Sequence, residues 1–381
     1  MHLSKLLLFF LTSVFVLAQE VRPEKRAIWV VRDALSDPAE LQKIVSTAAS
    51  ADISDIYVQV RALGRCYYLS DIEPRAPFIS NDYDPLNLLI KMCENYNIRV
   101  HAWINMFYIW SGAQPPPEKN HPYNLFPRYI LAKEKLPEYA DLKKAGIEGY
   151  FLDPQSIDIN KYLLNVLMEV ADKYLINGIH LDYFRYPDVE YSFTADSRTN
   201  FRLGHFLDPQ KLYSDPEKFV DYYGYGVFQH ADKEYRQFLQ QSLSNYLSEI
   251  YKTVKKKKTN LELSVAVKPD PVEAKFRYFQ DWQNWIRNQY CDNVVLMNYR
   301  TEWKDFIKVL NQLQDTPERE KIIMGISTYN QDENAVQKRL KAVRQGGFGG
   351  FALFSYNYLA GNKNYFYNLN LLDYRGDKNG N

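Results

Sequence analysis

The sequence has 381 residues, with 47 Lys and Arg side chains against 46 Asp and Glu side chains. Residues 1–18 hold one Lys and no acidic residue, so the rest of the chain carries 46 charges of each sign and no net charge. This balance excludes the broad positive field that attracts nucleic acids or anionic membranes, and a hydrophobic content of 46% excludes a largely disordered chain.

The first 18 residues have the pattern of a secretory signal peptide. Lys5 precedes the apolar stretch 6–17, and Ala18 supplies a small side chain before a cleavage site. This apolar stretch is too short to cross a bilayer core of about 30 Å as a helix. We therefore predict a signal peptide at residues 1–18 and a single domain over residues 19–381. We also predict an exported protein, periplasmic or extracellular, without a membrane span.

The cysteine content is low. Cys66, Cys93 and Cys291 allow at most one disulfide, and their spacing is not typical of a zinc site. Cys93 shares an apolar helical stripe with Leu86 and Leu89, which predicts a buried core position. Redox or metal chemistry therefore finds no support in the cysteines.

Eight short segments rich in β-branched and aromatic residues alternate with helical patterns. They occupy residues 26–31, 55–60, 99–104, 178–182, 261–267, 293–297, 321–326 and 350–355. Asp37-Pro38 and Asp84-Pro85 each predict a helix start, because Asp caps a helix and Pro fits its first turn. The alternation predicts an α/β fold, a (β/α)8 TIM barrel. Long insertions are expected after the third and fourth strands, at residues 105–157 and 183–234.

Polar side chains gather where the predicted strands end. In a (β/α)8 barrel the loops at these carboxyl ends build the active site. The candidates for binding a substrate are Gln59, Arg61, His101, Trp103, Asn105, His180, Tyr183, Arg185, Asn298 and Tyr299. Such polar groups hydrogen-bond sugar hydroxyls, and aromatic faces cover the C–H surfaces of sugar rings. The set favours a carbohydrate site, although Gln59 and Arg61 also fit a buried pair, and Trp103 also fits core packing.

Three carboxyl groups are candidates for catalysis. Glycosidic bond hydrolysis generally uses one carboxyl group as an acid and a second as a nucleophile or base. Asp182 ends an apolar strand and is predicted to be the nucleophile or base; an ion pair with Arg185 or Arg61 is its structural alternative. Glu302 follows the sixth strand and Asp270 the fifth, and either is a candidate for the acid.

A catalytic metal is not predicted. His101 and His180 could join Asp182 as ligands, but the His-x-His pair typical of the first strand of metal-dependent barrel hydrolases is missing. No Gly-x-Ser-x-Gly motif is present either, which disfavours esterase chemistry. We therefore predict no metal and no other cofactor.

Several segments resemble the strand signatures of a known family, the bacterial glycosyl hydrolase-like family 10. In chain order they are RAIWV at 26–30, YVQVR at 57–61, DPL at 84–86, VHAW at 100–103 with Asn105, LDP at 152–154 and GIHLDYFRYP at 178–187. The resemblance implies an exported (β/α)8 glycosidase-like protein with a polysaccharide substrate, in some members a peptidoglycan glycan strand. It also supports Asp182 as a family position.

The predicted function is therefore that of an exported glycoside hydrolase acting on a polysaccharide or oligosaccharide. A non-catalytic carbohydrate-binding barrel and a metal-dependent hydrolase are the alternatives. Tyr is unusually abundant, at 31 residues, and many rings fall at strand ends or in the predicted insertions. We expect these rings to wall the cleft: Trp103, Phe107, Tyr108, Trp110, Tyr123, Tyr183, Tyr186, Tyr222, Tyr223, Tyr225, Tyr299, Trp303, Tyr356 and Tyr358.

Overall fold

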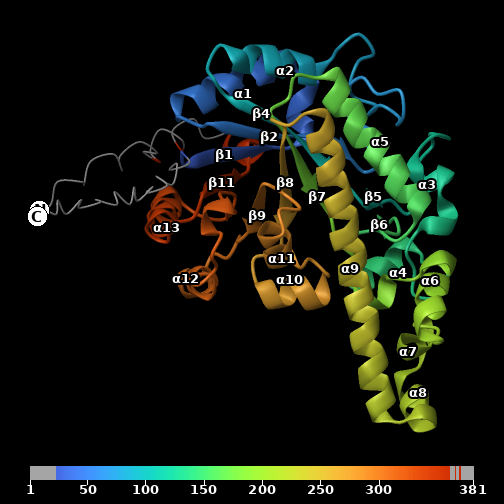
Figure 1. Ribbon diagram of the computed structural model, residues 1–381. Coiled ribbons are helices and arrows are strands. Elements are labelled where there is room, and N and C mark those ends of the chain that lie inside the picture. Colours follow the sequence, from blue (N-terminus) through green and yellow to red (C-terminus); the bar gives the residue numbers. More distant parts are fainter. Residues whose placement is uncertain (1–22, 361–364, 366–368, 370–381) are drawn as a thin grey trace, which may run out of the picture.

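The computed structural model describes residues 23–360, 365 and 369 (Figure 1). Over these residues, eight parallel strands close into a barrel, because β1 pairs with both β2 and β11. Around the barrel the strands are β1 (Lys25–Val30), β2 (Asp55–Ala62), β4 (Arg99–Asn105), β7 (Gly178–Asp182), β8 (Glu262–Val267), β9 (Asn293–Met297), β10 (Ile322–Ser327) and β11 (Gly350–Phe354). The predicted (β/α)8 barrel is confirmed, and each strand matches a predicted segment to within two residues.

Alternating side chains along the strands build two layers of core. Trp29 and Tyr57 belong to a cluster inside the barrel, whereas Ile28 and Val30 belong to the larger core between strands and helices. Because both faces of each strand are buried, the strands read as nearly continuous apolar runs. Burial of each large apolar side chain stabilises the fold by about 1.5–3 kcal/mol relative to exposure.

Helices cover the outside of the barrel. The larger ones are α1 (Pro38–Ser50), α2 (Pro85–Glu94), α5 (Ile157–Lys173), α9 (Tyr225–Lys257), α10 (Pro271–Arg277), α11 (Trp282–Arg287), α12 (Trp303–Gln312) and α13 (Glu333–Gln345), with α14 (Tyr356–Leu359) after β11. The two Asp-Pro predictions are confirmed: Asp37 accepts a hydrogen bond from the backbone N–H of Ala39 at the start of α1, and Asp84 accepts one from Asn87 at the start of α2.

Two long segments follow β4 and β7. The first contains β5 (Tyr108–Trp110), α3 (Pro122–Leu125), α4 (Tyr139–Lys144) and β6 (Tyr150–Phe151), and β5 pairs with β6 in a separate small sheet. The second contains α6 (Ala195–His205), α7 (Gln210–Ser214) and α8 (Pro216–Tyr223). Figure 1 shows that α9 extends well beyond the barrel and that α8 packs against its far end. We call α6, α7, α8 and this part of α9 the arm.

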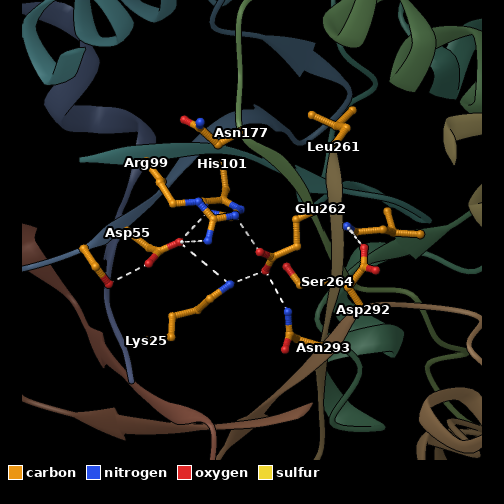
Figure 2. Close-up of polar contacts among 12 residues, drawn as sticks. Lys25, Asp55, Arg99, His101, Asn177, Leu261, Glu262, Ser264, Asp292 and Asn293 are labelled. Atoms are coloured by element: carbon orange, nitrogen blue, oxygen red, sulfur yellow. Dashed lines mark hydrogen bonds and ion pairs between the residues drawn. The ribbon is translucent and has the colours of Figure 1, made fainter. Parts of the chain in front are cut away.

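A charged network closes the amino-terminal end of the barrel (Figure 2). The Nε2 atom of His101 lies 2.6 Å from Asp55 Oδ1, and Lys25 forms ion pairs with both Asp55 and Glu262. Arg99 donates to Glu262 Oε2 at 2.6 Å. Lys25, Asp55, Arg99 and Glu262 are the first residues of their strands and His101 is the third residue of β4, so the barrel itself brings them together.

The predicted core position of Cys93 is confirmed. Cys66, Cys93 and Cys291 are all buried free thiols, and Cys93 lies on the buried face of α2 as expected. The predicted signal peptide lies outside the described residues. Within the part of the chain that the structure describes, no helix has both the length and the apolar character needed to cross a membrane.

Candidate active site

A cavity of about 400 Å³ opens at the carboxyl ends of the barrel strands. Its lining combines polar, charged and aromatic side chains from the strand ends and from the segments after β4 and β7. The lining residues are Trp29, Val31, Arg32, Gln59, Leu63, Trp103, Asn105, Tyr108, Ser111, Glu148, Asp182, Tyr183, Arg185, Ala266, Lys268, Met297, Tyr299 and Phe354. This is the end at which (β/α)8 enzymes carry their active sites.

Asp182 is the last residue of β7 and lines this cavity while remaining 92% buried. Its Oδ2 atom accepts a hydrogen bond from the indole N–H of Trp103 at 3.1 Å, and its Oδ1 atom accepts one from the backbone N–H of Tyr183 at 2.7 Å. Tyr183 has a positive φ of 50°, a strained conformation that directs its N–H back to the carboxyl group. Burial raises the pKa of Asp182, and it outweighs the opposing effect of these donors and of Arg185.

Glu148 is the second carboxyl group in the lining. It lies between α4 and β6, in the segment that follows β4, and pairs with Arg185 at 2.5 Å. Arg185 itself is buried against the rings of Phe151 and Tyr183. No ion pair joins Asp182 to Arg185 or Arg61 within the described residues, so the structural alternative for Asp182 is not observed.

Aromatic rings form the walls. Tyr299 stacks on Phe354 with centroids 5.3 Å apart, and Tyr108 packs on Tyr183 at 4.6 Å. Trp29 makes edge-to-face contacts with Tyr299 and Phe354. The rings leave apolar faces toward the cavity, which suit the C–H surface of a sugar ring.

The predicted aromatic wall is partly wrong. Trp103, Tyr108, Tyr183 and Tyr299 line the cavity, and the other predicted rings do not. Phe107 and Tyr186 are buried in the core, whereas Tyr222 and Tyr223 lie on the arm. Adjacent residues of an extended chain point to opposite sides, so Tyr108 faces the cavity while Phe107 faces the core.

Two amides of the predicted set meet at the cavity. Gln59 donates from Nε2 to Asn105 Oδ1 at 3.3 Å and accepts from Nη1 of Arg32 at 3.0 Å. Both side chains are almost fully buried and line the site. The arrangement fixes the direction of each amide, which is the orientation a hydroxyl-binding group needs.

Four predicted binding residues do not line the cavity. His101 belongs to the network at the amino-terminal end of the barrel, and His180 lies inside the barrel between Trp29 and Ser264, to which it hydrogen-bonds. Arg61 is fully buried in a bidentate ion pair with Glu73, rather than paired with Gln59. These strand residues point into the barrel below the cavity or into the surrounding core.

Asn298 is the fourth of these residues. It is fully buried and donates from Nδ2 to the backbone carbonyl of Phe306 at 3.3 Å. Its neighbour Tyr299 faces the cavity instead. The turn that follows β9 separates these two side chains, so adjacency in the sequence does not place them in one site.

The two acid candidates also lie outside the lining. Asp270 caps α10, where its Oδ1 atom accepts from the backbone N–H groups of Val272 and Glu273. Glu302 is exposed at the residue before α12. The carboxyl group that shares the cavity with Asp182 is Glu148, which the sequence reasoning missed.

No local pattern pointed to Glu148. It lies in an irregular loop between α4 and β6, and no motif or spacing relates it to Asp182 at the end of β7. Lys268, Arg32, Trp29 and Phe354 were also absent from the predicted binding set, although each lies at or just after the end of a barrel strand. Their positions at strand ends could therefore have indicated that they line the cavity. Among the described residues, no group of three or more His, Cys, Asp and Glu side chains is arranged to hold a metal ion.

The closed barrel, with a polar and aromatic cavity at the carboxyl ends of its strands, places the molecule in the class of (β/α)8 barrel proteins. Residues 24–339 match the model of the Glycosyl hydrolase-like 10 family, and the chain belongs to that family. The family suggested by the strand signatures is thus confirmed.

The comparisons with individual proteins are more distant. The chain is similar to Glycosyl hydrolase DigH of Escherichia coli strain K12, at 21% identity over 160 residues, which covers 40% of this chain. That match spans 35%, about a third, of the length of DigH.

Two solved structures share the fold. The catalytic domain of β-amylase from Paenibacillus polymyxa has a TM-score of 0.53 at 12% identity, covering 88% of this chain and 93% of that one. The cold-adapted β-galactosidase from Rahnella sp. R3 has a TM-score of 0.57 at 12% identity, covering 88% of this chain and 51% of that one. At such low identity these likenesses show the fold alone.

Proposed function

We propose that the protein is a glycoside hydrolase in which Asp182 and Glu148 supply the two carboxyl groups for cleavage of a polysaccharide or oligosaccharide. The observation that carries the proposal is the composition of the cavity. Asp182 and Glu148 are the two carboxylic side chains among its described lining residues, and aromatic faces and oriented amides surround them. Glycosidic bond hydrolysis uses this combination.

The environments of the two carboxyl groups suggest their roles. Burial raises the pKa of Asp182 and favours its protonated form, which a general acid requires to protonate the leaving oxygen. Glu148 forms an ion pair with Arg185, and a carboxylate is the form that attacks the sugar or activates water. Burial thus favours the acid role for Asp182 over the nucleophile or base role expected from its strand-end position.

We also propose export of the enzyme and a cell-wall substrate. The signal-peptide pattern of residues 1–18 supports export. The resemblance in strand signatures supports a polysaccharide substrate, with peptidoglycan glycan strands as the first to test.

The test measures reducing ends released from a panel of glycans that includes peptidoglycan strands. Asp182→Asn and Glu148→Gln keep the shape of each side chain but remove its acid–base chemistry. We expect each to lower kcat by about 10²–10⁴-fold. Glu94→Gln, which changes an exposed carboxyl group on α2, is the matched control and should retain wild-type turnover.

Three outcomes would contradict the proposal. Wild-type turnover in folded Asp182→Asn protein, checked by circular dichroism, excludes Asp182 from the chemistry. If wild-type protein binds glycans and releases no product, the molecule is a carbohydrate-binding barrel without catalysis. Loss of activity on chelator treatment would favour the metal-dependent alternative.

A further inference from the structure

Lys268 is a half-buried cation that lines the same cavity as the candidate catalytic residues. It directly follows β8 and lines the cavity, and its backbone N–H donates to Gln280 Oε1 at 3.0 Å. Its Nζ atom lies 4.7 Å from the centroid of the Tyr278 ring. No Asp or Glu oxygen of the described chain lies within ion-pair distance of this ammonium group.

A second cation lies against the same ring. The Arg185 guanidinium carbon is 4.9 Å from the Tyr278 centroid, so Tyr278 holds Lys268 and Arg185 near one another. Arg185 has Glu148 as its partner, whereas Lys268 has none. Burial and the charge of Arg185 lower the pKa of Lys268, and they outweigh the more distant carboxylates of Glu148, Glu273 and Asp182. The free protein therefore keeps a cation in a place that disfavours it.

The formal charge of the cavity lining also favours an anionic ligand. Arg32, Arg185 and Lys268 line it against the two acids Asp182 and Glu148. Arg32 contacts Gln59, and its nearest acid is the largely exposed Asp33 at 3.9 Å. A neutral sugar needs no such surplus, because its hydroxyls bind to amides and rings. An anion on the substrate would supply the partner that Lys268 lacks.

We infer that Lys268, with Arg185 beside it, forms a subsite for a carboxylate carried by the sugar, so that the preferred glycan is acidic. The inference rests on the proposed glycan substrate and specifies its chemical class. In the bound state the sugar carboxylate accepts hydrogen bonds from the Lys268 ammonium group. Arg185 remains paired with Glu148 and contributes its charge, while Tyr278 limits where Lys268 can move.

The experiment compares one glycan in two chemical forms. Peptidoglycan glycan strands, and separately a polyuronate, are used as isolated and after reduction of their carboxylates to primary alcohols. Turnover and equilibrium binding are measured for wild type, Lys268→Met and the control Lys91→Met, which changes an exposed lysine on α2. Lys268→Arg tests whether a cation alone restores the preference.

We expect wild type to prefer the carboxylate form by at least about tenfold in kcat/KM, as for loss of one charge-assisted hydrogen bond. Lys268→Met should reduce this preference to near parity by losing activity on the carboxylate form only. Lys268→Arg should retain part of the preference, and Lys91→Met all of it.

Other outcomes separate this inference from the proposed function. Equal cleavage of both forms by wild type overturns the inference and leaves a glycoside hydrolase. A full preference that survives in Lys268→Met overturns the role of Lys268. If no glycan is cleaved, the proposed function fails, and binding decides the inference: tighter binding of the carboxylate form supports it, and equal binding overturns it.

Discussion

At the scale of single residues, Asp182 lies under two opposing influences. Burial at the end of β7 disfavours its charged form, while the N–H groups of Trp103 and Tyr183 stabilise that form. Burial prevails, and the pKa is raised. The carboxyl group thus stays protonated to a higher pH than an exposed aspartate, as a general acid requires.

Trp103→Phe tests this balance. The change removes one donor to the carboxylate, so the pKa of Asp182 should rise further. A general acid acts in its protonated form, so activity falls as the pH rises through its pKa. The basic limb of the kcat–pH profile should therefore move to higher pH, by roughly one unit for one lost hydrogen bond. Trp110→Phe is the control, because the Trp110 indole N–H donates to the Gln114 carbonyl instead. A shift to lower pH, or an equal shift in both variants, contradicts the assignment.

At the scale of elements, the loop after β8 explains why one strand-end acid is directed away from the cavity. Asp270 precedes Pro271 at the start of α10 and accepts two backbone N–H groups of that helix. These bonds lower the pKa of Asp270 against the effect of burial. The Asp-Pro pattern, which is typical of a helix start, thus indicates that Asp270 is a helix cap and not a catalytic acid.

Substitution of Asp270 distinguishes the two roles. Asn caps a helix about as well as Asp, whereas Ala does not. We expect Asp270→Ala to lower the free energy of unfolding by about 1 kcal/mol in urea denaturation, and Asp270→Asn to stay close to wild type in both stability and turnover. A stable Asp270→Asn protein without glycan cleavage would instead restore Asp270 as the acid.

At the scale of the whole molecule, the two ends of the barrel have different tasks. The carboxyl end carries the cavity, and the amino-terminal end carries the buried charges of Figure 2. Burial alone would raise the pKa of Glu262, but the positive charges of His101, Lys25 and Arg99 outweigh it and lower that pKa to about 2. Burial also lowers the pKa of His101 below its usual value, despite Asp55.

These shifts predict loss of stability in acid. Glu262 has a lower pKa in the folded protein than in the unfolded chain, so its contribution is complete above about pH 4.5 and disappears as pH falls toward 2. The buried neutral His101 adds a loss that begins below about pH 6.5. Urea unfolding across this range should show the decline, on the order of 3 kcal/mol for Glu262.

Glu262→Gln is the matched variant for this prediction. It should be less stable than wild type near pH 7 and should lose less stability between pH 4.5 and 2. Glu94→Gln should follow the wild-type curve. Identical pH dependence in wild type and Glu262→Gln would remove Glu262 from the acid response.

The sequence by itself determined the barrel, its strands and the family, because each of these depends on local periodicity, caps and short signatures. It also identified Asp182, Trp103, Tyr183 and Tyr299 from their positions at strand ends. Only the tertiary structure decided which strand-end groups face one cavity. His180 and Asp182 are two residues apart on β7 and point to the same side, but His180 lies one layer deeper in the barrel, below the site that Asp182 lines.

That Asp182 and Glu148 line one cavity, and that no carboxylate of the described chain pairs with Lys268, came from the tertiary structure alone. Glu148 belongs to a loop after β4, and no sequence spacing relates it to a residue that ends β7. The burial that raises the pKa of Asp182 depends on rings from several strands. The charge balance around Lys268 likewise depends on charged side chains from different segments of the chain. Contacts between distant segments have no local signature, so the chemistry of this site became visible only once the chain was folded.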